Sequence, residues 1–210
     1  MNYPKQNAHM RVKFLDDNAY DVQDYVWIYN TNVGHSPRRF TTAHRSILHA
    51  TKSKDNKFYK DNVAVPYQNP TDKRIQGRIA AGHLGRMPYS WFYFDLVKNV
   101  SKDKTFHSCQ IPLKLVEMLI KSCTQEGDDV FILFGGSGSE LFTCKDLKRN
   151  YISCELHPDY YKMIIDRLEN NGKIKDEFRL DFIQQKNGQT LPIELNLFSG
   201  QYEAQRHNKG

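Results

Sequence analysis

The sequence lacks long apolar runs, since no stretch of its 210 residues approaches the roughly 20 that a membrane-spanning helix needs. Its first residues, Met1 to Lys5, also lack the charged start and apolar run of a secretory signal. The four cysteines form no C-x-x-C pair, which argues against a zinc cluster and against a disulfide framework. These absences predict a soluble, cytoplasmic, unprocessed protein with no membrane partner and no metal site.

Positive charge is concentrated in one segment of an otherwise ordinary globular composition. Between Arg38 and Arg86, eleven basic residues stand against three acidic ones, an excess of eight, although the whole chain carries only +6. Aromatic residues alternate with these cations, and four prolines argue against long helices. We predict a loop-rich lobe over residues 34–106 that binds duplex DNA, with a solvated basic face as the alternative. The candidate DNA contacts are Arg38, Arg39, Arg45, Lys52, Lys54, Lys73 and Arg74.

Short strands are predicted at both ends of the chain. The runs 11–15 and 25–29 are separated by Asp, Asn and Ala, which favours an antiparallel strand pair within residues 1–33. At the other end, alternating runs flank Lys186-Asn187-Gly188, so residues 171–210 are predicted to form an appended hairpin or tail.

Residues 107–170 have the pattern of a strand–helix–strand unit. Apolar residues at helical spacing predict a helix over 113–123. A continuous apolar run at 130–134 indicates a strand buried on both faces, and a glycine-rich loop and a second helix follow it. Another strand at 151–154 leads into a helix that begins at Pro158. This half is therefore predicted to be α/β with a parallel sheet.

The loop Gly135-Gly-Ser-Gly-Ser139 is the first candidate ligand site. Glycines let a ligand approach the backbone, and the start of the next helix offers unpaired N–H groups. Glu155 stands 17 residues after Gly138, close to the roughly 20 expected where an acidic residue accepts ribose hydroxyls. Neither a Gly-Lys-Ser/Thr sequence nor a third fingerprint glycine is present. S-adenosylmethionine, a nucleoside without phosphates, therefore fits better than ATP or NAD, and a glycine turn without a ligand is the alternative.

Three segments, 107–120, 127–139 and 149–161, occur in an order and spacing that resemble the carboxy-terminal half of DNA amino-methyltransferases. These are the N6-adenine and N4-cytosine enzymes of restriction–modification systems. Upstream, Val26 to Asn30 and Arg39 to His44 resemble a strand and the start of the target-recognition region. That order is the one found in the subgroup whose catalytic motif comes before its cofactor motif.

The resemblance implies a Rossmann-like α/β methyltransferase fold that uses S-adenosylmethionine as cofactor. The glycine loop would wrap the methionine part, Glu155 would hold the ribose, and the segment from His107 would close the pocket. Ile132 and Leu133 stand where the family commonly has Asp-Pro, which could weaken cofactor affinity. The implied cofactor-binding residues are His107, Gln110, Pro112, Phe134, Gly135, Gly136, Ser137, Gly138, Ser139 and Glu155.

The family's base-holding tetrapeptide, Asp/Asn/Ser-Pro-Pro-aromatic, is absent, because the sequence contains no Pro-Pro. Val65-Pro66-Tyr67 and Met87-Pro88-Tyr89 are partial look-alikes inside the basic lobe. The fold is therefore expected to lack its first central strands, and the catalytic residues are unknown. We expect an adenine-N6 DNA methyltransferase in a truncated or split form, whose partner is a second chain. The alternatives are a non-catalytic DNA- and cofactor-binding subunit, a degenerate relative, and a methyltransferase of structured RNA.

Overall fold

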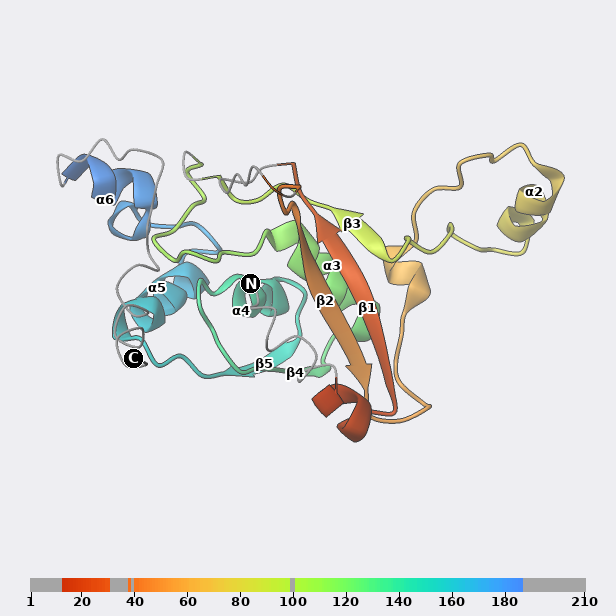
Figure 1. Cartoon of the computed structure of the whole chain (residues 1–210), viewed down its shortest axis with the longest axis horizontal. Coiled ribbons are helices and arrows are strands. Elements are labelled where there is room, and N and C mark those ends of the chain that lie inside the picture. The colour runs from red at the N-terminus through yellow and green to blue at the C-terminus, as the bar shows by residue number, and fades with distance from the viewer. Residues whose placement is uncertain (1–12, 31–37, 39, 99–100, 187–210) are drawn as a thin grey trace.

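The computed structural model of the chain describes residues 13–30, 38, 40–98 and 101–186. These residues form two sheets, and helix α3 (Leu113–Cys123) packs against the cores of both (Figure 1). One sheet has three strands and the other has two. In spatial order, the strands are β2 (His44–Thr51), β1 (Asp21–Ile28) and β3 (Trp91–Tyr93) in the first sheet, and β4 (Asp129–Ile132) and β5 (Asn150–Ser153) in the second.

The three-stranded sheet joins segments that lie far apart in the sequence. Strand β1 pairs antiparallel with β2 along its whole length and parallel with β3. Trp27 of β1 is 3% exposed and donates its indole N–H to the carbonyl of Phe94 at 2.8 Å. The strand predicted over 11–15 is wrong, because residues 13–18 are helical. The antiparallel partner of β1 instead comes from within the segment 34–106.

The two-stranded sheet is the predicted parallel βαβ unit. Strands β4 and β5 pair in parallel, with Asp129 opposite Asn150, and helix α4 (Ser139–Asp146) connects them. Helix α5 (Pro158–Glu169) follows β5 and begins at the predicted proline. Apolar side chains from this unit form one core cluster, made of Ile132, Leu141, Cys144 and Ile164.

The two faces of the β4–β5 sheet differ. The side chains on the face toward α4 and α5 are partly or fully buried, as expected for a sheet packed against helices. On the opposite face, Phe131 is 64% exposed and Ile152 is 70% exposed, and Leu133 beyond β4 is 60% exposed. Within the described residues β4 pairs with β5 alone, so its other edge is free.

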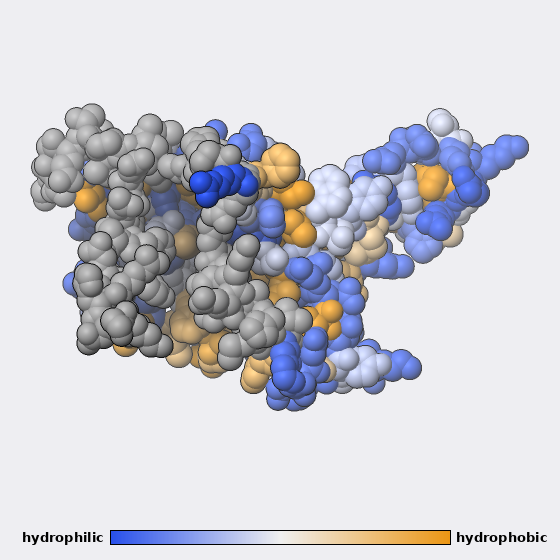
Figure 2. Space-filling model, in the orientation of Figure 1, coloured by the Kyte–Doolittle hydropathy of each residue, from blue (hydrophilic) through white to orange (hydrophobic). Residues whose placement is uncertain are grey.

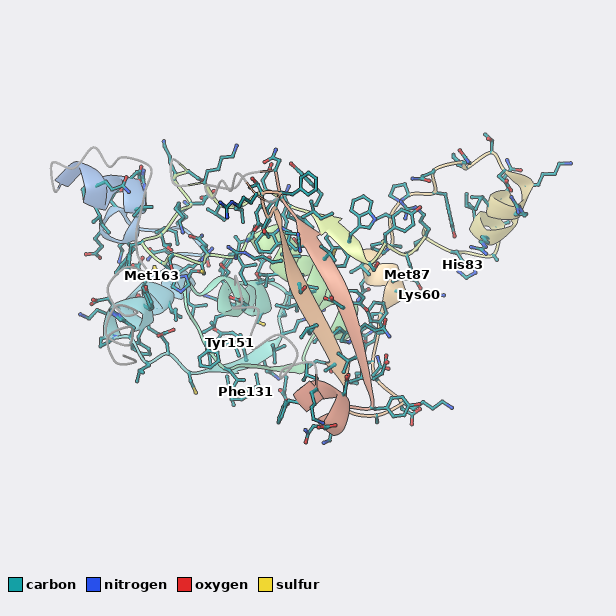
Figure 3. All side chains as sticks on the ribbon, in the orientation of Figure 1. Lys60, His83, Met87, Phe131, Tyr151 and Met163 are labelled. Carbon is teal, nitrogen blue, oxygen red and sulfur yellow. The ribbon has the colours of Figure 1, made fainter. Side chains whose placement is uncertain are left out.

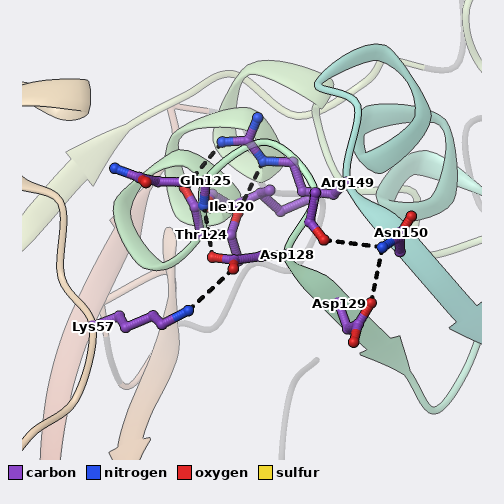
Figure 4. A network of polar contacts seen from close by, with 9 residues as sticks. Lys57, Ile120, Thr124, Gln125, Asp128, Asp129, Arg149 and Asn150 are labelled. Carbon is purple, nitrogen blue, oxygen red and sulfur yellow. Dashed lines mark hydrogen bonds and ion pairs between the residues drawn. The ribbon is translucent and has the colours of Figure 1, made fainter.

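Helix α3 connects the two sheets. Leu115 packs with Trp27 and Tyr29 in the core of the three-stranded sheet, whereas Ile120 packs against the core of the βαβ unit. A polar network at the end of α3 adds to this connection (Figure 4). There, Lys57 contacts Asp128 at 3.1 Å, and Arg149 donates to the carbonyl of Thr124 at 2.9 Å.

The part of the basic segment that follows β2, residues 52–86, leaves the body of the molecule and returns to it. A 3-10 turn, η1 (Lys60–Val63), lies against α3, since Asn62 donates to the carbonyl of Lys121 at 3.1 Å. Helix α2 (Lys73–Ala80) contains no buried residue and is capped by Asp72. Figures 1 and 2 show that α2 extends well away from the sheets and that its surface is mostly hydrophilic.

The tail does not form the predicted hairpin where it is described. A 3-10 turn, η2 (Asp176–Phe178), and helix α6 (Leu180–Lys186) occupy the stretch in which the first hairpin arm is predicted. The remainder, 187–210, lies outside the described residues. In the described part of the chain, no helix combines the length and the apolar character needed to span a membrane.

Candidate functional site

The glycine loop lies at the carboxyl end of β4 and leads directly into α4. Gly136 and Gly138 both have positive φ, +53° and +72°, which side-chain-bearing residues rarely adopt. A Cβ at Gly136 would also come within 3.2 Å of Nε2 of His107. The loop therefore needs glycine for its conformation and for the close approach of the His107 ring.

Glu155 faces this loop from the end of β5. One carboxylate oxygen accepts the backbone N–H of Gly136 at 2.8 Å, and the other accepts that of His157 at 2.8 Å. Partial burial alone would raise the pKa of Glu155. The backbone hydrogen bonds and the nearby His107 outweigh burial and hold this pKa below its usual value. The site therefore contains a fixed carboxylate anion beside the glycine backbone.

His107 covers the other side of the loop. Its ring meets that of Tyr160 edge-on, with centroids 4.7 Å apart. Burial and the positive charge of Lys104 lower the pKa of His107 despite the opposing charge of Glu155, which favours the neutral ring. Its Nδ1 is buried and has no hydrogen-bond partner among the described residues. A buried nitrogen without a partner is unusual in a folded protein and is available to a ligand.

Arg167 of α5 supports the loop from beneath. It is 2% exposed and donates to the carbonyl of Ser137 at 2.8 Å and to Oγ of Ser139 at 3.2 Å. Burial lowers the pKa of Arg167 to about 10, so the guanidinium remains charged at neutral pH. Sequence reasoning missed this residue. A cation on the apolar face of a helix, in line with Met163 and Ile164, is the signal that could have identified it.

The predicted cofactor residues divide into those that face the loop's outer side and those that support it. Phe134 is 81% exposed beside the loop. Ser137 and Ser139 are buried, lie 3.0 Å apart through their hydroxyls, and bond inward. The structure thus brings His107, Gly136 and Glu155 together and places the two serine hydroxyls in the layer beneath them.

Gln110 and Pro112 lie before α3, and the Gln110 side chain is used within its own loop. Its Oε1 accepts the backbone N–H of Thr105 at 2.9 Å, and its amide group donates to the carbonyl of Asp103 at 2.8 Å. Pro112 is the residue before α3 and caps its start without a side-chain hydrogen bond. The Gln110 side chain therefore shapes the segment that carries His107, and its contact with a cofactor stays a prediction.

The sequence model of the DNA methylase family, that of N6 and N4 methyltransferases, matches residues 1–166. The chain belongs to this DNA methylase family. The matched residues include both sheets, the basic segment, the glycine loop, His107 and Glu155, and the match ends one residue before Arg167.

Individual relatives of the chain are type II methyltransferases. It is 26% identical over 193 residues to M.BglII of Bacillus subtilis, a match that covers 88% of this chain and 51% of the relative. It is 29% identical over 185 residues to M1.MboII of Moraxella bovis, covering 79% of this chain and 70% of that relative. The match therefore spans about half of the length of the first relative and 70% of the length of the second.

Two solved structures establish the fold. The M1.HpyAVI–SAM complex superposes with a TM-score of 0.59 at 23% identity, covering 79% of this chain and 71% of that one. The PvuII DNA methyltransferase, described as cytosine-N4-specific, also gives 0.59, at 20% identity and with coverages of 87% and 64%. The predicted α/β, Rossmann-like methyltransferase fold is confirmed.

The predicted DNA contacts that the structure describes lie on different elements. Arg45 lies on β2 and stacks its guanidinium over the Trp27 ring at 5.2 Å, so it packs on the sheet. Lys52 and Lys54 are exposed in the turn after β2. Arg74, at the start of α2, pairs with Asp72 at 3.2 Å, and Lys73 is its exposed neighbour. The structure describes Arg38 without its two neighbours in the chain, and Arg39 is outside the described residues.

Proposed function

We propose that this chain holds S-adenosylmethionine at the glycine loop and duplex DNA at the basic segment, as part of an enzyme that methylates adenine N6. One observation carries the proposal. The carboxyl ends of β4 and β5 gather a glycine loop, an anionic Glu155 and a neutral His107 within one site. Adenine is proposed over cytosine because it is the more common target in the family.

The residues present suit this cofactor. The Glu155 carboxylate accepts backbone N–H groups of Gly136 and His157, and a carboxylate with about four acceptor positions can also accept a ribose hydroxyl. Phe134 and Leu156, which are 81% and 97% exposed, offer apolar surface on either side of the loop for the adenine ring or the methionine chain. His107 presents an unpartnered nitrogen. S-adenosylmethionine would supply the transferable methyl group, and these residues would bind and orient it.

The base-holding part of the enzyme is proposed to come from strands beyond these 210 residues. Neither partial motif is on the β4–β5 sheet: Pro66 and Pro88 lie at the base of the α2 segment, where Val65 and Arg86 form an antiparallel bridge. Parallel sheets normally bury both faces and pair both edges of their inner strands. The edge of β4 that is unpaired within the described residues and the exposed Phe131 support a site where strands from a further segment or a second chain would pair.

A non-catalytic subunit that binds DNA and cofactor is the second candidate. The absence of any Pro-Pro sequence favours it, because the family's base-holding motif needs that pair. In this case the chain would bind both ligands and another protein would supply the chemistry independently.

The test is to express this chain together with a polypeptide that carries an Asp-Pro-Pro-Tyr strand pair and to analyse DNA after incubation with labelled S-adenosylmethionine. We expect N6-methyladenine in the DNA hydrolysate and its loss with Gly136→Asp. N4-methylcytosine would correct the target, and transfer to RNA alone would contradict the DNA assignment. A folded complex that binds the cofactor without transferring methyl would favour the non-catalytic subunit.

A further inference from the structure

Two aromatic side chains form an exposed stack at the outer edge of the three-stranded sheet. Tyr89 and Trp91 are each 51% exposed, and their rings lie 5.9 Å apart at an interplanar angle of 20°. They alternate with Phe92 and Phe94, which pack against the core of this sheet. The core is therefore complete without Tyr89 and Trp91, and half of each large ring is left in solvent.

Arg86 extends the stack at the end nearest the α2 segment. Its guanidinium carbon lies 4.3 Å from the centroid of the Tyr89 ring, close enough for a cation–π contact. The backbone of Arg86 is fixed by two hydrogen bonds with Val65, both 2.9 Å long. Gly85 permits this approach, because a Cβ there would lie 2.3 Å from the carbonyl oxygen of Val65. The backbone at Gly85 and Arg86 therefore holds the Arg86 guanidinium next to the Tyr89 ring.

The charge of Arg86 is not neutralised within the protein. The salt bridges of the described residues do not include it. Its Nε is buried without a hydrogen-bond partner in the same part of the chain. One of its terminal nitrogens donates to the carbonyl of Met87 at 3.1 Å. An arginine held over a ring with unused donors is suited to a phosphate group.

A cavity of about 490 Å³ lies beside Arg86 at the base of the α2 segment. Figure 3 shows Lys60, His83 and Met87 of its lining close together between the sheet and α2. Arg78 also lines it, and Asp61 is the acidic residue of its wall. Cations therefore outnumber anions around the cavity, as a polyanion would require.

We infer that Tyr89 and Trp91 stack on unpaired bases of the DNA strand, while Arg86 and the adjacent cavity bind its phosphates. The inference rests on the DNA binding of the proposed function. It specifies which surface would bind the bases that become unpaired. An enzyme that turns a base out of the duplex leaves bases unpaired near its recognition surface. Aromatic rings beside a cationic groove are the usual means of binding such bases without reading their sequence.

Tryptophan fluorescence gives a direct test on the intact chain. The two tryptophans differ sharply, since Trp27 is 3% exposed and Trp91 is 51% exposed. We expect a single-stranded oligonucleotide of mixed sequence to quench the emission, and Trp91→Phe to remove most of that quenching. Unchanged emission at saturating oligonucleotide, or the same quenching in Trp91→Phe, would overturn the inference.

Affinity measurements on matched variants give a second test. Tyr89→Ala and Trp91→Ala should each weaken single-strand binding about tenfold, since one stacked base contributes roughly that much, and should change duplex binding far less. Tyr20→Ala is the control, because Tyr20 is 61% exposed at the other end of the sheet and should have no effect. Arg86→Gln should weaken both forms and reduce the salt dependence. Equal losses for single strand and duplex in Trp91→Ala would contradict stacking.

Failure of this inference differs from failure of the proposed function. Duplex binding without quenching, and without any effect of Tyr89→Ala, would refute the stacking platform and leave the methylase proposal intact. If the chain bound no DNA at all, this inference and the DNA-binding part of the proposed function would both be refuted. Protection of Trp91 by an added polypeptide but not by DNA would assign this surface to a protein partner and overturn the inference.

Discussion

The charged groups at the glycine loop and those around the cavity beside Arg86 are held in different ways. In the first, Arg167 and Glu155 are held by hydrogen bonds to the backbone of the loop itself. In the second, Arg86 and the cations of the neighbouring cavity have no salt-bridge partner within the described residues. Internal pairing fixes a pocket for a small ligand, whereas unpaired surface cations keep their charge available for a polyanion.

The largest effect is expected at Gly136. Gly136→Asp places a side chain at positive φ, within 3.2 Å of the His107 ring, and adds an anion beside Glu155. Like charges and strain of about 3 kcal/mol or more would lower S-adenosylmethionine affinity roughly 100-fold, measured by calorimetry. Gly77→Ala is the control, because it lies in α2 with nothing within 4 Å. Normal cofactor binding by Gly136→Asp would place the pocket elsewhere.

Arg167 should contribute mainly to stability. Arg167→Met removes two hydrogen bonds and leaves the Ser137 carbonyl and the Ser139 hydroxyl short of a buried partner. We expect a loss of about 2 kcal/mol, which corresponds to a fall in Tm of roughly 4–8 °C. Thermal unfolding checks this, and Lys162→Met, on the exposed side of the same helix, should change little. Equal Tm values for both variants would show that the loop does not depend on Arg167.

A pH dependence of stability is expected from His107. Its pKa is lower in the folded state than in the unfolded state, so the unfolded chain binds the proton more readily. Stability should be full above a pH of about 6.5 and should fall as the pH drops through the folded pKa of His107. Denaturant titrations across this range, compared with His107→Asn, measure the effect. An unchanged slope in the variant would assign the pH dependence to other groups.

The smallest effect is expected at the tip of the basic segment. Lys73→Glu at the exposed start of α2 should weaken duplex DNA binding a few-fold and lower the salt slope by about 0.9 for each phosphate that the side chain no longer neutralises. Its Tm should not change, because α2 buries no residue. Lys162→Glu is the matched surface control. If both variants reduced DNA binding equally, the effect would reflect net charge and not this segment.

The βαβ unit could be predicted because its signals are local. Each strand and helix has its own periodicity, and Gly135 to Ser139 and Pro158 mark boundaries that the structure keeps. The three-stranded sheet was harder. In β2, Arg45 and His49 alternate toward the half-buried face, so the strand shows no apolar alternation in its sequence. The short run at 11–15 has the composition of a strand but is helical from residue 13. A few apolar residues are too short a pattern to distinguish the spacing of a helix from that of a strand.

The glycine loop and Glu155 could be predicted from the sequence, whereas the contacts that support them could not. Gly136 and Glu155 follow from spacing alone, and the structure joins them by a hydrogen bond. The inward role of Gln110 depends on the local loop that places it against Asp103, and that of Ser139 depends on Arg167, a partner distant in sequence. The same holds for Ile132. It belongs to the core cluster, which gives a physical reason why an apolar residue stands where the family commonly has aspartate.

The most direct measurement is equilibrium dialysis of the purified 210-residue chain with S-adenosylmethionine labelled in its methyl group, with and without unmethylated duplex DNA. We expect the chain to retain the cofactor and no label to enter the DNA, because the base-holding strands are proposed to come from outside these residues. Failure to retain the cofactor would contradict the assigned pocket. Label in the DNA would show that base-holding chemistry resides in this chain, with Tyr67 and Tyr89 as the first residues to replace.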